Sequence, residues 1–354
     1  MPRNPLVMDC GIFTTRYKDD MAILHHPGAK LKVLVVIIVF AAFPLFASPY
    51  YVGVANLVGI AVIGALGLNI LTGYTGQISI GHGAFMGVGA YTAGILTATH
   101  GLSFWIALPL GGIAAALVGA FFGIPSLRLK GLYLAIATLA AQVIIHFLII
   151  HTPSLTKGTA GMVLPAPQIG SYRLDNDLSF YYLILILTIA AVVFATNIFR
   201  SRVGRAFMAI RDRDLAASVI GINLFQYKLL AFALSSFYAG VAGALWGHYM
   251  GVISPEHFTI NMSIMYLAMI IIGGLGSIMG AIFGAFFMTL LPILLREAVS
   301  LFGGVFANIS GIILSMQDAI FGLIIILFLI YESEGLAKLW KNFKEYFKLW
   351  PFSY

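Results

Sequence analysis

Charged side chains are scarce in this sequence of 354 residues: Asp, Glu, Lys and Arg make up 9% of it, against 60% hydrophobic residues. Soluble domains carry about 25% charged residues. A soluble protein of this composition would have too few polar side chains to cover its apolar core in water. The composition therefore predicts an integral membrane protein. A single cysteine, Cys10, excludes a disulfide scaffold within the chain.

Acidic and basic groups are absent from long continuous stretches, the longest of which runs from residue 33 to residue 127. A helical span needs about 20 apolar residues, so this stretch holds roughly four crossings. It is almost continuously apolar instead of alternating, which favours helices over a β-barrel. The predicted segments lie near residues 33–47, 52–71, 84–99, 104–124, 131–151, 181–199, 227–250, 262–272, 281–295 and 314–331. We therefore expect an all-α polytopic membrane protein with about 8–10 transmembrane helices, some of them broken or re-entrant.

The basic residues predict the orientation, because cytoplasmic loops of membrane proteins are enriched in Lys and Arg. With both termini in the cytoplasm, all but three of the 20 Lys and Arg fall on the inner side, the exceptions being Lys157, Arg173 and Arg296. This distribution accounts for most of the net charge of +7, so we expect no nucleic-acid partner.

The charge distribution divides the chain into three parts. Residues 1–30 are expected to form a cytoplasmic arm, either a helix on the membrane surface or a frayed terminus. Residues 31–334 form the transmembrane domain. Residues 335–354 combine leucines and aromatic residues with four lysines, which predicts a basic amphipathic helix at the inner face of the lipid bilayer.

Two glycine-rich segments interrupt the apolar pattern, residues 73–83 and residues 273–280. Non-helical backbone at membrane depth is tolerated only where protein buries it or where it lines a water-filled cavity. One interpretation is therefore a pair of broken helices beside a translocation path; the other is a tight turn with close packing through small residues. The predicted path residues are Thr72, Gly73, Thr75, Gly76, Gln77, Ser79, Gly273, Gly276 and Ser277.

Residues 200–226 form the most charged loop. Asp212 or Asp214 favours a helix start there, the alanine pair 216–217 gives a small face, and Gly221 can end the helix in a left-handed conformation. The pattern predicts a short helix over 209–221 that lies along the membrane and meets a partner; an ordinary cytoplasmic loop is the alternative. The predicted contact residues are Arg211, Asp214, Ala216, Ala217 and Gly221.

Several of these motifs resemble segments of one class of transport proteins. The segment Ala216-Ala217-x-x-x-Gly221 resembles the loop by which ABC importer permeases dock on their ATPase, although Leu215 stands where those permeases usually have Glu. Residues 67–85, 127–139 and 273–277 resemble segments of branched-chain amino-acid ABC permeases, and order and spacing hold over roughly residues 50–336. The whole resembles the M-type permease of leucine/isoleucine/valine importers.

The resemblance implies an ABC importer permease fold in the bacterial inner (plasma) membrane. It implies a second, related permease subunit, two ABC ATPase subunits and a periplasmic substrate-binding protein as partners. ATP would be held by the ATPases, and indeed this sequence has no phosphate-binding G-x-x-x-x-G-K-[ST] motif. The implied function is ATP-driven import of branched-chain amino acids by alternating access.

Four alternatives remain at this point. Permeases for urea or short-chain amides share much of the resemblance. A secondary carrier typically needs a carboxylate within the membrane, and Asp318 alone is placed to supply one. A passive solute channel would explain the glycine segments but not the helix over 209–221. An enzyme is disfavoured because the sequence has no H-E-x-x-H, G-x-S-x-G or Cys/His cluster; we therefore expect no catalytic residue and no metal site.

Overall fold

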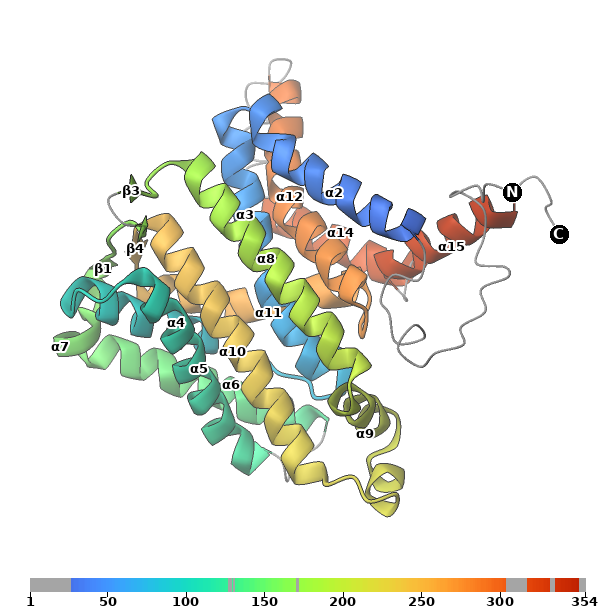
Figure 1. The fold of residues 1–354 in the computed structure, drawn as a ribbon. Coiled ribbons are helices and arrows are strands. Elements are labelled where there is room, and N and C mark those ends of the chain that lie inside the picture. The colour runs from blue at the N-terminus through green and yellow to red at the C-terminus, as the bar shows by residue number, and fades with distance from the viewer. Residues whose placement is uncertain are drawn as a thin grey trace.

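The computed structural model describes residues 27–126, 129, 131–169, 172–303, 317–331 and 335–349 (Figure 1). Its helices are α2 (Pro27–Phe46), α3 (Pro49–Leu68), η1 (Asn69–Tyr74), α4 (His82–Gly94), η2 (Ile95–Thr99), α5 (Phe104–Ser126), α6 (Leu132–His151), α7 (Pro153–Thr156), η3 (Gly158–Ala160), α8 (Asp177–Arg200), α9 (Arg202–Val219), α10 (Leu224–Met250), η4 (Pro255–Phe258), α11 (Ile260–Gly273), α12 (Ile278–Gly303), α14 (Gln317–Tyr331) and α15 (Leu336–Leu349). The strands are β1 (Met162–Val163), β2 (Gln168–Ile169), β3 (Tyr172–Arg173) and β4 (Val252–Ile253). The predicted arm over 1–30 lies outside the described residues except for its last four residues, which begin α2.

Each of the ten predicted segments overlaps a helix, the last of them from Gln317 on because 314–316 lie outside the described residues, and the prediction of an all-α polytopic membrane protein with broken helices is confirmed. Within the described chain, six helices are long and apolar enough to cross a membrane, and two shorter apolar helices cover Leu31–Phe46 and Ile260–Gly273. The predicted end of segment 281–295 is wrong, because α12 continues through the charged pair Arg296 and Glu297 to Gly303. Arg and Glu are good helix formers, so a charged pair need not end a helix.

Helices α3 and α10 form the centre of the bundle. The most apolar part of the span Pro49–Tyr74, which comprises α3 and η1, is 78% buried, and the corresponding part of α10 is 61% buried, against 28% for α8. Helix α10 packs against α4, α5 and α3, and its Gly240 and Gly243 lie against the backbones of α5 and α4. Small residues of this kind allow helices to approach closely where lipid supplies no hydrophobic driving force.

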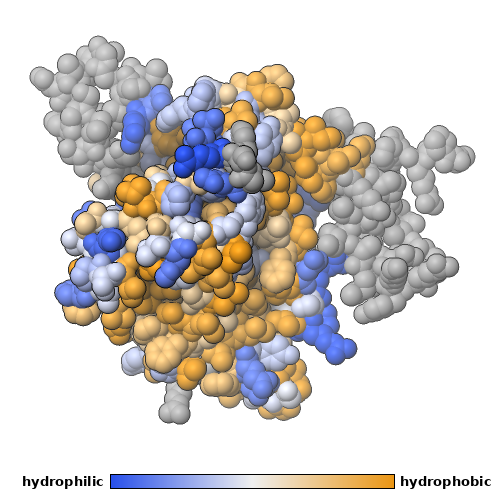
Figure 2. Space-filling view, turned by 60° about the vertical axis from the view of Figure 1, so that its left-hand side comes forward, coloured by the Kyte–Doolittle hydropathy of each residue, from blue (hydrophilic) through white to orange (hydrophobic). Residues whose placement is uncertain are grey.

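The outer surface of the bundle is apolar. Leu117, Phe121 and Ile186 expose 67%, 69% and 66% of their surface, and Figure 2 shows hydrophobic residues gathered broadly over one face, with hydrophilic patches toward its edges. A surface of this composition suits contact with lipid.

The bundle has two recognisable ends (Figure 1). At one end α8 finishes and α10 begins, with α9 connecting them; we call this the α9 end. At the other end lie two small antiparallel sheets, in which Met162 pairs with Ile253 and Gln168 pairs with Arg173; we call this the sheet end.

Candidate functional site

The two glycine-rich segments lie against each other near the α9 end. The chain leaves α3 through the π-helix η1 and stays non-helical over residues 75–81 before α4 begins; the second segment separates α11 from α12. Asn69, the first residue of η1, joins them: its Nδ2 donates to the Ser277 carbonyl (2.9 Å), and its Oδ1 accepts from the Gly276 amide (3.0 Å). The structure therefore brings these two segments together although they are far apart in the chain; we call residues 73–83 the first break and residues 273–280 the second break.

Glycine is required at this contact because backbone meets backbone. A Cβ on Gly73 would lie 2.5 Å from the Gly276 nitrogen, and a Cβ on Gly276 would lie 3.0 Å from the Gly73 carbonyl oxygen. Gly276 also has φ +72°, a conformation that side-chain-bearing residues rarely adopt. Close packing through small residues is thus observed at both breaks.

Most of the polar side chains predicted to line a path form hydrogen bonds with backbone groups of the two breaks. Thr72 donates to the Gln77 carbonyl (3.1 Å) and Thr75 to the Ile70 carbonyl (2.9 Å). The hydroxyls of Ser79 and Ser277 accept from the Gly81 and Gly280 amides, at 3.4 and 3.1 Å. These bonds satisfy backbone groups that no helix satisfies. Contact of the same residues with solute stays a prediction.

A second set of side chains holds the start of α4. The Gln142 Oε1 accepts from the Ala84 amide (2.7 Å) and its Nε2 donates to the Phe258 carbonyl (2.7 Å). Ser263 accepts from the Gly83 amide (2.8 Å) and donates to Gln142 (3.1 Å). The Gly83 and Ala84 amides at the N-terminus of α4 therefore donate to residues of α11 and α6, and the Ala84 amide also donates to the Gly81 carbonyl (3.1 Å).

His82, the titratable residue of the first break, is the first residue of α4 and is buried. Its ring packs against Tyr266 at 5.2 Å between centroids, and its Nε2 has no hydrogen-bond partner in the part of the chain that is described. The ring position fits a residue that packs inside the bundle.

Helix α9 begins earlier than the predicted residue 209, because Ser201 caps it by accepting from the Val203 amide (3.1 Å). Arg213 has non-helical backbone angles and divides α9, so that a final short segment begins at Asp214, one of the two aspartates expected to favour a helix start. That segment ends at Val219, Gly221 just beyond it has φ +89°, and the Ile222 amide donates to the Ala217 carbonyl (3.0 Å). This is the left-handed end predicted from the sequence.

The last segment of α9 presents apolar side chains to its surroundings. Leu215, Val219 and Ile220 are 72%, 86% and 73% exposed, and Ala216 is exposed beside them. Ala217 is buried and faces the bundle, so the alanine pair divides between the two sides. Asp214 lies 3.7 Å from the Lys228 Nζ, which ties the segment to α10. An exposed apolar patch with a fixed backbone suits a protein partner.

Arg211 connects α9 to the breaks. Its Nη1 donates to the Gly73 carbonyl (3.3 Å), and its stem lies over Gly76. Close by, the ring of Tyr74 stacks on Phe199 at the end of α8, with centroids 3.4 Å apart. Among the predicted partner-contact residues, Arg211 is thus the one placed against the breaks.

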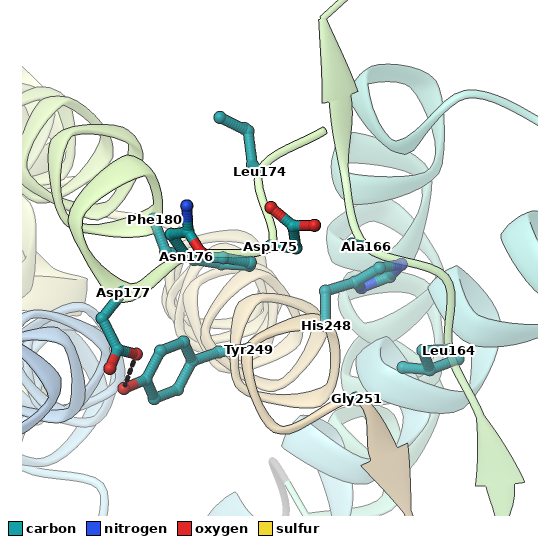
Figure 3. Close-up of a pocket in the computed structure, with 10 residues that line it drawn as sticks. All are labelled: Leu164, Ala166, Leu174, Asp175, Asn176, Asp177, Phe180, His248, Tyr249 and Gly251. Atoms are coloured by element: carbon teal, nitrogen blue, oxygen red, sulfur yellow. Dashed lines mark hydrogen bonds between the residues drawn. The ribbon is translucent and has the colours of Figure 1, made fainter. Parts of the chain in front are cut away.

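A cavity of about 180 Å³ opens at the sheet end (Figure 3). Its walls combine the carboxylates of Asp175 and Asp177 with the rings of Phe180, His248 and Tyr249. The Tyr249 hydroxyl donates to Asp177 (3.0 Å). Carboxylates beside aromatic faces can hold an ammonium group. None of these residues was predicted as a site residue, although the run of Asp, Asn and Asp before an apolar span was a visible signal in the sequence.

Asn69 and Gln142 were also missed as site residues. Both are buried amide side chains within long charge-free stretches. An isolated amide at membrane depth needs a hydrogen-bond partner, so each of them signalled a tertiary contact, but the sequence did not show where the partner was.

Comparison with known proteins identifies the family. Residues 50–329 match the family described as the permease component of branched-chain amino acid transport systems. The chain is 32% identical to the high-affinity branched-chain amino acid transport system permease protein LivM of Escherichia coli over 76% of this chain and 69% of that protein. It is 27% identical to LivH of the same organism over 62% of this chain and 76% of LivH, and 25% identical to a probable LivM of Methanocaldococcus jannaschii over 65% and 67%. No solved structure matches significantly. The chain therefore belongs to the family of permease components of branched-chain amino acid transport systems.

Proposed function

We propose that this chain is the M-type permease subunit of an ATP-driven importer for branched-chain amino acids in a bacterial inner membrane. The observation that carries the proposal is the α9 segment, because a family member without an ATP-binding motif needs a surface that receives the ATPase. The segment after Arg213 offers one: its backbone is capped at Gly221, and it exposes the apolar side chains of Leu215, Val219 and Ile220.

The partners follow from the same proposal. The chain is similar both to LivM and to LivH of Escherichia coli, which supports pairing with a second permease related to LivH. Two ATPases would bind at the α9 end, and a periplasmic binding protein would deliver solute at the sheet end. The α9 end would face the cytoplasm, since Arg200, Arg202 and Arg205 lie there.

In this scheme transport proceeds by alternating access. Closure of the ATPases on ATP moves the two α9 segments of the permease pair together, and the helices beside the path respond. The permease binds solute weakly at each stage, because a carrier that held solute tightly would not release it. The carboxylates and rings at the sheet end, Asp175 and Tyr249 among them, would first meet the ammonium and apolar parts of the amino acid.

Reconstitution tests the proposal. The chain is purified with its second permease and ATPase, and leucine uptake and ATP hydrolysis are measured in proteoliposomes with the binding protein. Ala216→Trp, on the exposed side of α9, is expected to abolish complex formation and uptake. Ala98→Trp, at an exposed alanine near the sheet end, is the matched control and should leave the complex intact.

Three results would overturn the proposal. Normal assembly and uptake by Ala216→Trp would exclude α9 as the docking element. Uptake that survives ATP depletion but collapses with the proton gradient would identify a secondary carrier. Competition by urea or acetamide, but not by isoleucine and valine, would assign the substrate to the amide-transporting relatives.

A further inference from the structure

Three elements meet at one point near the α9 end: the first break, the second break and α9. Asn69 joins the first break to the second, and Arg211 of α9 reaches the Gly73 carbonyl between them. A Cβ on Gly276 would lie 2.8 Å from the Arg211 Nη1, so the guanidinium borders both breaks. Any movement of α9 relative to the broken helices must therefore change contacts at this point.

The hydrogen bonds that Asn69 makes to the second break are costly to break. The side chain is fully buried, and its amide makes one donor and one acceptor bond, of 2.9 and 3.0 Å, to adjacent residues of the second break. Opening the pair would leave polar groups of both breaks unsatisfied in a low-dielectric interior, which is costly. The two breaks are thus expected to move as one body.

The hydrogen bond from Arg211 to the Gly73 carbonyl is easier to break. Its guanidinium is divided between two acceptors: the Gly73 carbonyl at 3.3 Å, and the Asp212 carboxylate, 3.1 Å from both Nε and Nη2. The side chain is 38% exposed. Arg211 can therefore leave Gly73 without becoming unpaired, because Asp212 on its own helix still accepts from it.

We propose that Asn69 and Arg211 are positioning residues that couple the movement of α9 to the broken helices. Asn69 fastens the two breaks into one body, and Arg211 is the releasable contact through which α9 shifts that body. The inference rests on the proposed function, since it assigns the route by which ATPase closure reaches the solute path.

The test measures leucine transported per ATP hydrolysed in the reconstituted importer. Asn69→Leu and Arg211→Met are each expected to lower this ratio, within the range of about 5- to 150-fold typical of couplings between sites, while ATP hydrolysis continues. A residue with a merely structural role would lower hydrolysis and transport together. Arg211→Lys, which keeps a donor and the charge, should restore part of the ratio.

Each variant has a matched control in the chain. Thr188 also joins two helices through one side chain, but it lies on α8 and donates to the Gly59 carbonyl of α3 (3.2 Å), and neither residue lines the cavity or belongs to the breaks. Arg205 is an arginine of α9 that donates to the Arg200 carbonyl (3.1 Å) and not to the breaks. Thr188→Val and Arg205→Met should therefore keep the wild-type ratio, whatever they do to stability.

The outcomes separate the two proposals. Failure of the wild-type complex to couple ATP hydrolysis to leucine uptake overturns the proposed function. A working wild type whose Arg211→Met variant keeps the wild-type ratio overturns the coupling inference, as does an Asn69→Leu ratio equal to that of Thr188→Val. If Asn69→Leu does not fold, Asn69→Ala removes both hydrogen bonds without adding bulk or charge, and the same ratio decides.

Discussion

Gln142 is expected to be among the side chains that contribute most to the stability of the first break. It is 2% exposed and takes part in three hydrogen bonds, with the Ala84 amide, the Phe258 carbonyl and the Ser263 hydroxyl. Gln142→Leu keeps much of the volume but removes all three bonds. Hydrogen bonds between membrane helices contribute about 0.6 kcal/mol on average and up to about 1.7 kcal/mol, so the loss should be roughly 2–5 kcal/mol.

Thermal unfolding in detergent, followed by size-exclusion chromatography of heated samples, measures this loss. A destabilisation of that size corresponds to a fall in Tm of roughly 3–10 °C. Gln226→Leu, at an exposed glutamine of α10, is the matched control and should change the Tm little. If Gln142→Leu unfolds at the same temperature as Gln226→Leu, the capping of α4 by α6 contributes nothing, and the reasoning about the break is refuted.

Three further predictions concern other parts of the chain. Gly276→Ala should reduce both stability and uptake, because its Cβ would lie 3.0 Å from the Gly73 carbonyl oxygen, whereas Gly322→Ala, in open space on α14, should be tolerated in the same assays. Val219→Glu should weaken the ATPase complex in a pull-down without lowering the Tm, because that side chain is 86% exposed. Replacing Lys341 and Lys344 of α15 by Gln should reduce the dependence of uptake on anionic lipid in vesicles of varied composition, since each lysine near such a surface contributes about 1 kcal/mol.

Local features of the fold were predictable because their causes are local. Charge-free stretches located the helices, and Gly221 was correctly predicted to end α9 because a left-handed residue closes a helix through neighbouring carbonyls. The predicted start of α9 at residue 209 is wrong because Ser201 caps the helix further upstream. Its sequence signal, a serine before a charged helix, was present.

The contact between the breaks could not be predicted in the same way. Asn69 and Gly276 are 207 residues apart, and nothing in either segment specifies the other. The sequence did show two glycine-rich breaks, but only the fold shows that a Cβ at Gly73 or Gly276 would strike the opposite backbone. Likewise, Gln142 is recognisable as a buried amide, whereas its partners on α4, η4 and α11 depend on packing.

The hydrogen bonds of the first break also separate two kinds of polar residue within it. Thr72 and Thr75 donate to backbone carbonyls, so neither hydroxyl can donate to a solute without giving up that bond. The Gln77 Nε2 has no partner within the described residues although the side chain is 5% exposed, so it can donate to a solute without breaking a bond. If the path passes the break, Gln77→Leu should raise the KM for leucine at an unchanged Tm, whereas Thr75→Val should lower the Tm. Equal KM values for wild type and Gln77→Leu would place the path away from this side chain.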